Sequence, residues 1–122
     1  MQTAQNIKNN LNHLFNDLAK SIHSNFENSK VIIFGSYARN EQTIDSDLDI
    51  CVLIPYFKQD KLQTKLALRK AINNTMPIGL DILVFTYDEY NEAINKQSYI
   101  QYEINREGVT IDGKSWNNER VV

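Results

Sequence analysis

Two aspartates alternate with apolar residues at the start of a short run, 47–54, that has the composition of a buried strand. Successive side chains of a strand point to opposite faces, so Asp47 and Asp49 share one face, about 6–7 Å apart along it. Carboxylates beside an apolar core are costly unless something positive binds them, and two so close repel until one takes up a proton. The run therefore predicts a strand whose acidic face binds a cation. The opposite face enters the core and consists of Leu48, Ile50, Val52 and Ile54.

The rest of the chain alternates helical and strand-like segments. Apolar residues at helical spacing predict an amphipathic helix near the start of the chain, and β-branched runs predict further strands over 31–35 and 80–85. Strong helix formers predict a helix over 59–75. The polar residues 36–43 are expected to form a short helix or a turn. The apolar residues of the first helix are Ile7, Leu11, Leu14, Phe15, Leu18 and Ile22.

Two short helices and one strand are expected in the last third of the chain. Thr86 or Asp88 is positioned to cap a helix over 86–95. Gly108 is expected to end the next helix, and residues 109–112 to form a last short strand. The polar tail that follows is too short for a prediction.

The order of these elements predicts one α/β (α+β) domain over residues 1–122, with helices packed against a small mixed sheet. The chain has 122 residues and a net charge of -2, without the basic stripe that direct DNA binding needs. One cysteine, Cys51, allows no intramolecular disulfide, and no apolar run approaches the about 20 residues of a membrane span. We therefore expect a cytoplasmic protein that neither spans a membrane nor binds DNA directly.

A third acid stands in a setting similar to that of the first two. Asp81 opens the third predicted strand, and it faces Asp47 and Asp49 if the two strands are neighbours. Three carboxylates on neighbouring strands suit a pair of Mg²⁺ or Mn²⁺ ions, which clamp the attacking and leaving oxygens of an in-line phosphoryl displacement. The residues alone leave open that these acids lie on a solvent-facing side of the sheet. Asp45 precedes the strand and is expected to be a solvated turn residue, and Glu41 is set aside as lying outside the strand pattern.

A Gly-Ser pair follows the strand over 31–35. Glycine at a strand-to-helix turn lets backbone N–H groups approach a phosphate closely, and a serine hydroxyl can donate a further hydrogen bond. Gly35 and Ser36 are therefore candidates for holding phosphates. The alternative is an ordinary turn in which Ser36 caps a short helix.

The distance between the two features is informative. Gly35-Ser36, ten further residues and Asp47-Leu48-Asp49 form the pattern G-S-x10-D-x-D. This pattern resembles the nucleotidyltransferase superfamily related to DNA polymerase beta, and within it the minimal nucleotidyltransferase (MNT) proteins of bacteria and archaea. The resemblance extends to the third strand and to the Arg-Glu-Gly segment within 100–111, and it implies the polymerase beta-like nucleotidyltransferase fold.

The resemblance also implies a role for each matching residue. Asp47 and Asp49 would bind the catalytic Mg²⁺ pair, and Asp81 would complete the site and help to activate the attacking hydroxyl. Gly35 and Ser36 would hold the triphosphate of the incoming nucleotide. Arg39 would pair with phosphate or with an acid, a surface salt bridge being the alternative. Asn40 stands where the family commonly has Gly, and Asn tolerates a left-handed backbone better than most residues.

The implied reaction is transfer of AMP from ATP to a hydroxyl, with pyrophosphate leaving in line. In MNT proteins the acceptor is a tyrosine of a HEPN-type RNase toxin encoded nearby, and the MNT protein is the antitoxin. A non-catalytic antitoxin that inhibits by binding is one alternative. A small-molecule nucleotidyltransferase of the aminoglycoside type is another, although the short segment after the core leaves little room for an acceptor pocket.

Other polar side chains are expected to be structural or solvated. His13 and His23 lie off the apolar face of the first helix, and Cys51 is expected to line the core because no histidine partner is identifiable. A late cluster of tyrosines suits either a partner surface or ordinary packing, and a group of basic residues is expected to form a solvated helix face. The tyrosines are Tyr87, Tyr90, Tyr99 and Tyr102, and the basic residues are Lys58, Lys61, Lys65, Arg69 and Lys70.

Overall fold

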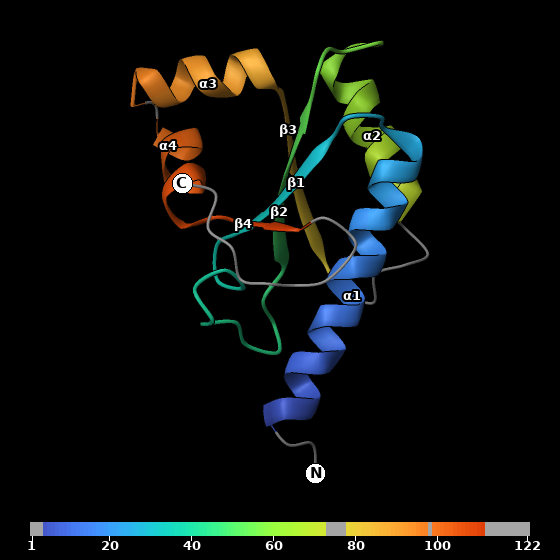
Figure 1. Cartoon of the computed structure of the whole chain (residues 1–122), viewed down its shortest axis with the longest axis vertical. Coiled ribbons are helices and arrows are strands. Elements are labelled where there is room, and N and C mark those ends of the chain that lie inside the picture. Colours follow the sequence, from blue (N-terminus) through green and yellow to red (C-terminus); the bar gives the residue numbers. More distant parts are fainter. Residues whose placement is uncertain (1–3, 73–77, 98, 112–122) are drawn as a thin grey trace.

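The computed structural model describes residues 4–72, 78–97 and 99–111. Its helices and strands follow the predicted order, and Figure 1 shows them arranged around one small sheet. The α/β (α+β) prediction is therefore confirmed. The elements are α1 (Ala4–Asn25), β1 (Lys30–Phe34), β2 (Leu48–Ile54), α2 (Lys61–Ile72), β3 (Leu80–Thr86), α3 (Tyr87–Asn95), α4 (Tyr99–Glu107) and β4 (Val109–Ile111).

A few predictions fall outside the described part of the chain. They concern the end of the predicted helix at 73–75, Asp112 of the last strand, and the tail over 113–122. The side chains of Ile7 and Tyr99 lie outside it as well. Among the described residues, no helix combines the length and the apolar character that crossing a membrane requires.

Local signals in the sequence set where α2 and α3 begin. The Asp60 carboxylate accepts a hydrogen bond from the Gln63 N–H at 2.8 Å, as an N-cap does. The Thr86 hydroxyl accepts from the Glu89 N–H at 3.1 Å, and the Glu89 carboxylate accepts from the Thr86 N–H at 2.9 Å. This reciprocal pair is a capping box. Of the two predicted caps of α3, Thr86 is the one used, and Asp88 lies inside the helix.

The sheet is mixed, as predicted, with strand order β3-β2-β1-β4. β1 pairs antiparallel with both β2 and β4, whereas β2 and β3 run parallel. Parallel neighbours require a crossover connection, and α2 supplies it. The predicted second strand begins at Leu48, one residue later than expected, so Asp47 directly precedes it.

Helices cover both faces of the sheet. α1 and α2 pack over a core cluster that contains Ile50 and Val52 of β2, as the strand pattern predicts. α3 and α4 contribute to a second cluster, which contains Cys51 and Leu53. Figure 1 shows α1 and α2 on one side of the sheet and α3 and α4 on the other. β2 is therefore apolar on both faces except near its start, where Asp49 interrupts the second face.

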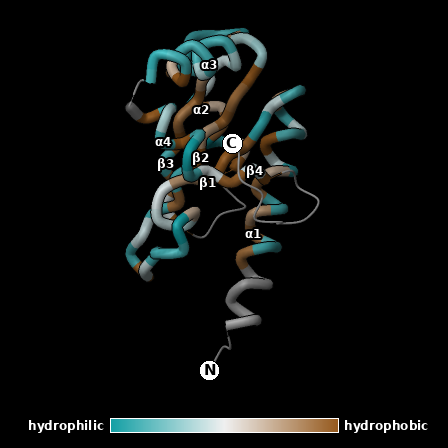
Figure 2. Tube along the Cα trace, turned by 60° about the vertical axis from the view of Figure 1, so that its left-hand side comes forward, coloured by the Kyte–Doolittle hydropathy of each residue, from teal (hydrophilic) through white to brown (hydrophobic). Residues whose placement is uncertain are grey.

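The connection from β1 to β2 runs over 35–47 and is mostly hydrophilic. Turns occupy 35–40, so the turn rather than the short helix is formed after β1. Figure 2 shows this connection largely in teal and white, in contrast to the brown of the sheet interior. Because Phe34 pairs with Asp49, the connection begins beside the first residues of β2. This antiparallel pairing brings the Gly-Ser turn to the acidic end of the strand.

Candidate nucleotide and metal site

The register of the sheet brings two of the predicted aspartates side by side. Asp49 of β2 pairs with Asp81 of β3. Paired residues of neighbouring strands carry their side chains on the same face, here the face that α3 and α4 cover further along. Asp47 lies next to the same strand pair, because the Leu48 N–H donates to the Gly79 carbonyl at 2.9 Å. The three acids therefore gather at one end of the β2–β3 pair.

Two glycines leave the space that these carboxylates occupy. A Cβ at Gly35 would fall 2.2 Å from Asp49 Oδ2, and a Cβ at Gly79 would fall 2.2 Å from Asp47 Oδ1. Non-bonded atoms do not approach so closely, so a side chain at either glycine would displace the carboxylate beside it. Gly35 has a φ of 72°, a left-handed conformation that glycine adopts without strain.

The Asp49 carboxylate is perturbed by its position in the fold. Partial burial raises the pKa of the Asp49 carboxyl above its usual range, and the neighbouring Asp81 carboxylate raises it further. The charge of Asp47 adds to this shift, while Arg39 opposes it. The protein therefore relieves the repulsion between the acids only in part, and a bound cation would relieve it further.

The donor set fits a divalent cation that is bound together with phosphates. Within the described residues, no three His, Cys, Asp or Glu side chains already converge on one metal position. Mg²⁺ commonly takes one or two carboxylates together with substrate phosphates and water, rather than a complete protein cage. Asp49 and Asp81 supply such carboxylates on adjacent strands. The site therefore fits Mg²⁺ or Mn²⁺ that enters with a triphosphate.

Arg39 forms salt bridges with acids at the surface of this structure, which is the alternative that the sequence left open beside phosphate binding. Its Nη1 donates to Glu107 Oε1 at 3.0 Å and to Oε2 at 3.2 Å, and its Nε donates to Glu41 Oε2 at 3.3 Å. Glu107 Oε1 also accepts a hydrogen bond from the Gly35 N–H at 3.3 Å. The Glu41 side chain is 65% exposed and pairs with Arg39.

The Gly-Ser turn is held by backbone hydrogen bonds. The Arg39 N–H donates to the Gly35 carbonyl at 3.1 Å, and the Glu41 N–H donates to the Ser36 carbonyl at 2.8 Å. Asn40 has a φ of 62°, so it takes a left-handed conformation in this turn. The expectation that Asn tolerates this conformation is confirmed.

Three residues beside the site were not predicted. Gly79 makes room for Asp47, and Glu107 holds the Gly-Ser turn. Tyr37 packs edge-on against Phe15 with ring centroids 6.3 Å apart, and burial, together with the Asp47 charge, raises the pKa of its hydroxyl. The sequence carries a signal for Glu107 only, through the Arg-Glu-Gly segment, and that signal does not specify a role.

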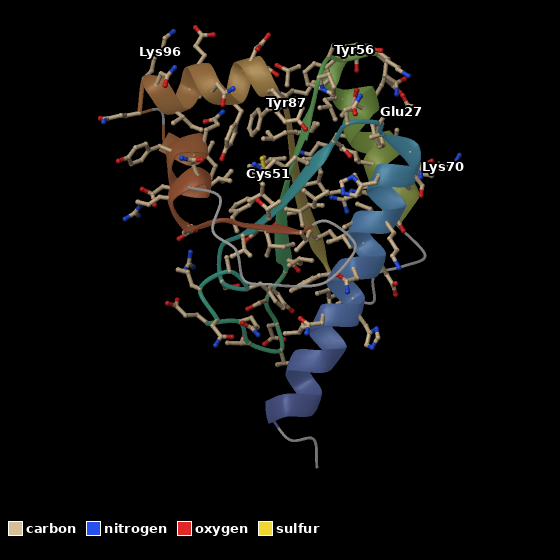
Figure 3. All side chains as sticks on the ribbon, in the orientation of Figure 1. Glu27, Cys51, Tyr56, Lys70, Tyr87 and Lys96 are labelled. Atoms are coloured by element: carbon tan, nitrogen blue, oxygen red, sulfur yellow. The ribbon has the colours of Figure 1, made fainter. Side chains whose placement is uncertain are left out.

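The residues expected to be structural or solvated mostly follow that expectation. His13 is exposed. His23 is half-buried, with Nδ1 2.9 Å from Ser29 Oγ, so it is less solvated than expected and makes a structural hydrogen bond. Cys51 is a free, buried thiol whose pKa burial raises to about 12, and Figure 3 shows it in the interior between the sheet and α3 and α4.

The late tyrosines do not form one surface within the described residues. Tyr90 is buried, Tyr87 donates to the Asn28 carbonyl at 2.6 Å, and Tyr102 is 39% exposed. The basic side chains along α2 are mostly exposed, as expected, and Figure 3 shows Lys70 pointing outward. A cavity of about 480 Å³ at the far end of β2, near Ile54, is lined by none of the candidate residues. The carboxylate chemistry, not this cavity, therefore marks the candidate site.

The fold and this cluster define a class of protein. A small mixed sheet that presents aspartates on adjacent parallel strands, beside a Gly-Ser turn, is the arrangement expected for nucleotidyl transfer. Residues 16–114 match the family described as "Nucleotidyltransferase domain". The chain belongs to this family, and the resemblance inferred from its motifs is confirmed.

One similar protein comes from Methanocaldococcus jannaschii and is named "Putative protein adenylyltransferase MJ0126". It is 36% identical to this chain over 64 residues, which are 52% of this chain and 63% of the relative. The matched segment therefore spans less than two thirds of that relative.

Two solved structures share the fold. One, described as "Crystal structure of the toxin-antitoxin with AMP-PNP", has a TM-score of 0.57 at 20% identity and covers 79% of this chain and 70% of its own. The other, described as a "putative nucleotidyltransferase" from Sulfolobus solfataricus, has a TM-score of 0.54 at 20% identity and covers 85% and 83%. At such identities the likeness establishes the fold alone.

Proposed function

We propose that this protein transfers AMP from ATP to a hydroxyl group in a Mg²⁺-dependent reaction. The observation that carries the proposal is the pairing of Asp49 with Asp81 beside the turn at Gly35. This arrangement places carboxylates that can bind divalent ions beside a turn that can donate hydrogen bonds to phosphates. Nucleotidyl transfer requires both features. The name of the M. jannaschii relative and the AMP-PNP of the toxin–antitoxin structure support ATP as the donor.

Each candidate residue has a role in this reaction. Asp47, Asp49 and Asp81 would hold two Mg²⁺ ions, or Mn²⁺ in their place, and when bound these ions would supply charge neutralisation of the triphosphate and polarisation of its α-phosphorus. Asp81 completes the metal site and helps to activate the attacking hydroxyl. The catalytic and metal-binding residues are Asp47, Asp49 and Asp81, and the nucleotide-binding residues are Gly35, Ser36 and Arg39.

The acceptor that we propose is a tyrosine of a HEPN-type RNase toxin encoded nearby, with which this protein forms a hetero-oligomer and acts as the antitoxin. Similarity to a protein named as an adenylyltransferase and to a structure described as a toxin–antitoxin supports a protein acceptor. Modification of a catalytically important tyrosine would silence the toxin without requiring continuous occupancy. We further propose that residues 1–122 act as a single nucleotidyltransferase domain in the cytoplasm, where the free thiol of Cys51 is compatible with the reducing conditions.

The decisive experiment incubates the purified protein with ATP, Mg²⁺ and the product of the neighbouring gene, and weighs that product by mass spectrometry. The expected result is a mass increase of one AMP, which disappears when EDTA is present. Asp49→Asn and Asp81→Asn should abolish it, whereas Asp45→Asn, which alters an exposed acid before the strand, should not.

The other outcomes separate the alternatives. An unmodified partner in a tight complex would overturn the catalytic proposal in favour of inhibition by binding. AMP transfer to an aminoglycoside instead of the partner would indicate a small-molecule enzyme. Full modification by a double variant, Asp47→Asn with Asp49→Asn, would show that the metal assignment is wrong.

A further inference from the structure

Glu107 connects the end of α4 to the Gly-Ser turn. Its carboxylate accepts a hydrogen bond from the Gly35 N–H at 3.3 Å and two from Arg39 Nη1, at 3.0 and 3.2 Å. The residues joined in this way lie 72 and 68 positions apart in the sequence. One side chain therefore fixes both a backbone group and a guanidinium of the proposed triphosphate site.

Glu107 is the better shielded of the two acids that bind Arg39, whose own side chain is 43% exposed. The Glu107 side chain is 21% exposed, compared with 65% for Glu41, the other acid that binds Arg39. Hydrogen bonds between charged groups gain strength as solvent is excluded, whereas fully exposed pairs contribute little. Glu107 is therefore the more effective of the two acids in fixing Arg39.

Arg39 keeps donors for a ligand while it is held. A guanidinium has five N–H donors. The hydrogen bonds to Glu41 and Glu107 use Nε and Nη1, and no hydrogen bond within the described residues uses Nη2. The carboxylates thus orient the guanidinium and leave its Nη2 donors for a ligand.

We propose that Glu107 is a positioning residue for the nucleotide. It holds the Gly35 peptide and the Arg39 guanidinium in place before the triphosphate binds, so that less freedom is lost on binding. The inference rests on the proposed function, because it assumes that the turn receives phosphates. It assigns Glu107 no contact with the reacting atoms, so its loss should weaken nucleotide binding through Arg39.

The opposite role makes a different prediction. If the carboxylate instead filled the position of a phosphate and had to be displaced, its removal would tighten nucleotide binding. Displacement would cost the hydrogen bonds of Glu107 and leave a carboxylate beside the incoming phosphates, where like charges repel. The contacts of Glu107 therefore favour preorganisation over displacement.

The test is calorimetric titration of the intact protein with Mg²⁺–AMP-PNP, a probe that needs no acceptor. Glu107→Gln should weaken binding about tenfold, the scale of one charge-assisted hydrogen bond. The matched control is Glu103→Gln on the same helix, since Glu103 pairs with Arg106 instead. It should stay within about twofold of the parent protein.

A double variant separates positioning from general structure. The glutamine amide oxygen can still accept from the Gly35 N–H, so the loss in Glu107→Gln should arise through Arg39. Arg39→Met combined with Glu107→Gln should therefore bind no more weakly than Arg39→Met alone. The shorter Glu107→Asp, which keeps the charge, should recover part of the lost affinity.

The outcomes distinguish this inference from the proposed function. A parent protein that does not bind the nucleotide would overturn the proposed function and the inference with it. A parent that binds, with Glu107→Gln binding equally well or more tightly, would overturn the inference alone. Additive losses in the double variant would do the same, because they would show that Glu107 does not act through Arg39.

Discussion

The carboxylate of Asp49 lies directly against Gly35, so that a Cβ at position 35 would stand 2.2 Å from Asp49 Oδ2. The two residues are brought together by the antiparallel pairing of β1 and β2, in which Phe34 is opposite Asp49. One end of this contact is the proposed phosphate turn and the other is a proposed metal ligand. A substitution at either residue should therefore shift the position of the other.

Replacing Gly35 with Ala should impair both stability and activity. The left-handed backbone at φ 72° costs a non-glycine residue about 1–2 kcal/mol, and the new methyl group would force the Asp49 carboxylate to move. We expect a lower midpoint in urea and an AMP-transfer rate lower by at least about 100-fold, the scale of several kcal/mol of metal stabilisation. A Gly35→Ala protein with parental stability would contradict the left-handed conformation of Gly35.

Replacing Asp49 with Asn should stabilise the metal-free protein at neutral pH while abolishing activity. Because the folded state raises the pKa of Asp49 above its ordinary value of 3.8, it binds a proton more tightly than the unfolded chain does. The resulting stability is fully present below pH 3.8 and is lost as the pH rises through the raised pKa. At neutral pH the ionised carboxylate therefore opposes folding.

The measurement is thermal unfolding of both proteins in EDTA at several pH values. The Asp49→Asn substitution should raise the midpoint by a few degrees at neutral pH, and the difference should shrink as the solution becomes acidic. A difference that grew towards acid pH would mean that Asp49 is held by a positive partner in the metal-free protein.

Position 40 offers a test of backbone conformation that spares the carboxylates. Asn40 has a φ of 62° and is exposed, so Asn40→Gly should leave the free energy of unfolding unchanged within about 0.5 kcal/mol. Asn40→Ala should destabilise by about 1 kcal/mol, because alanine tolerates the left-handed region poorly. Chemical denaturation of the three proteins measures both differences. Equal stability of the Ala and Gly variants would contradict the left-handed conformation of residue 40.

Cys51 should be unreactive in the folded protein. Its thiol is buried, and burial raises its pKa to about 12, so almost no thiolate exists at pH 8. A thiol reagent at that pH should label it only as fast as the protein opens, and denaturant should make labelling rapid. Fast labelling of the native state would show that the face under α3 and α4 is open to solvent.

The sequence determined much of the local structure of this protein and the candidate residues of its proposed site. Alternation within 47–54 placed Leu48, Ile50 and Val52 on one core face and Asp49 on the opposite face, because side-chain direction in a strand depends only on position along it. The capping box of α3 and the left-handed turn at Asn40 likewise follow from short-range preferences. Gly35, Ser36 and the three aspartates were recognisable because their types and spacing are local features.

Only the tertiary structure decided which of these residues meet. The sequence left open whether Asp81 lies beside Asp49, since strand order and register depend on the packing of α2 and on the parallel pairing. Glu107 lies 72 residues from Gly35, and no local pattern predicts that contact. The pKa of Asp49 likewise follows from burial and from neighbours that arrive through folding. The candidate site residues are therefore far apart in the sequence, and the folding of the sheet brings them together.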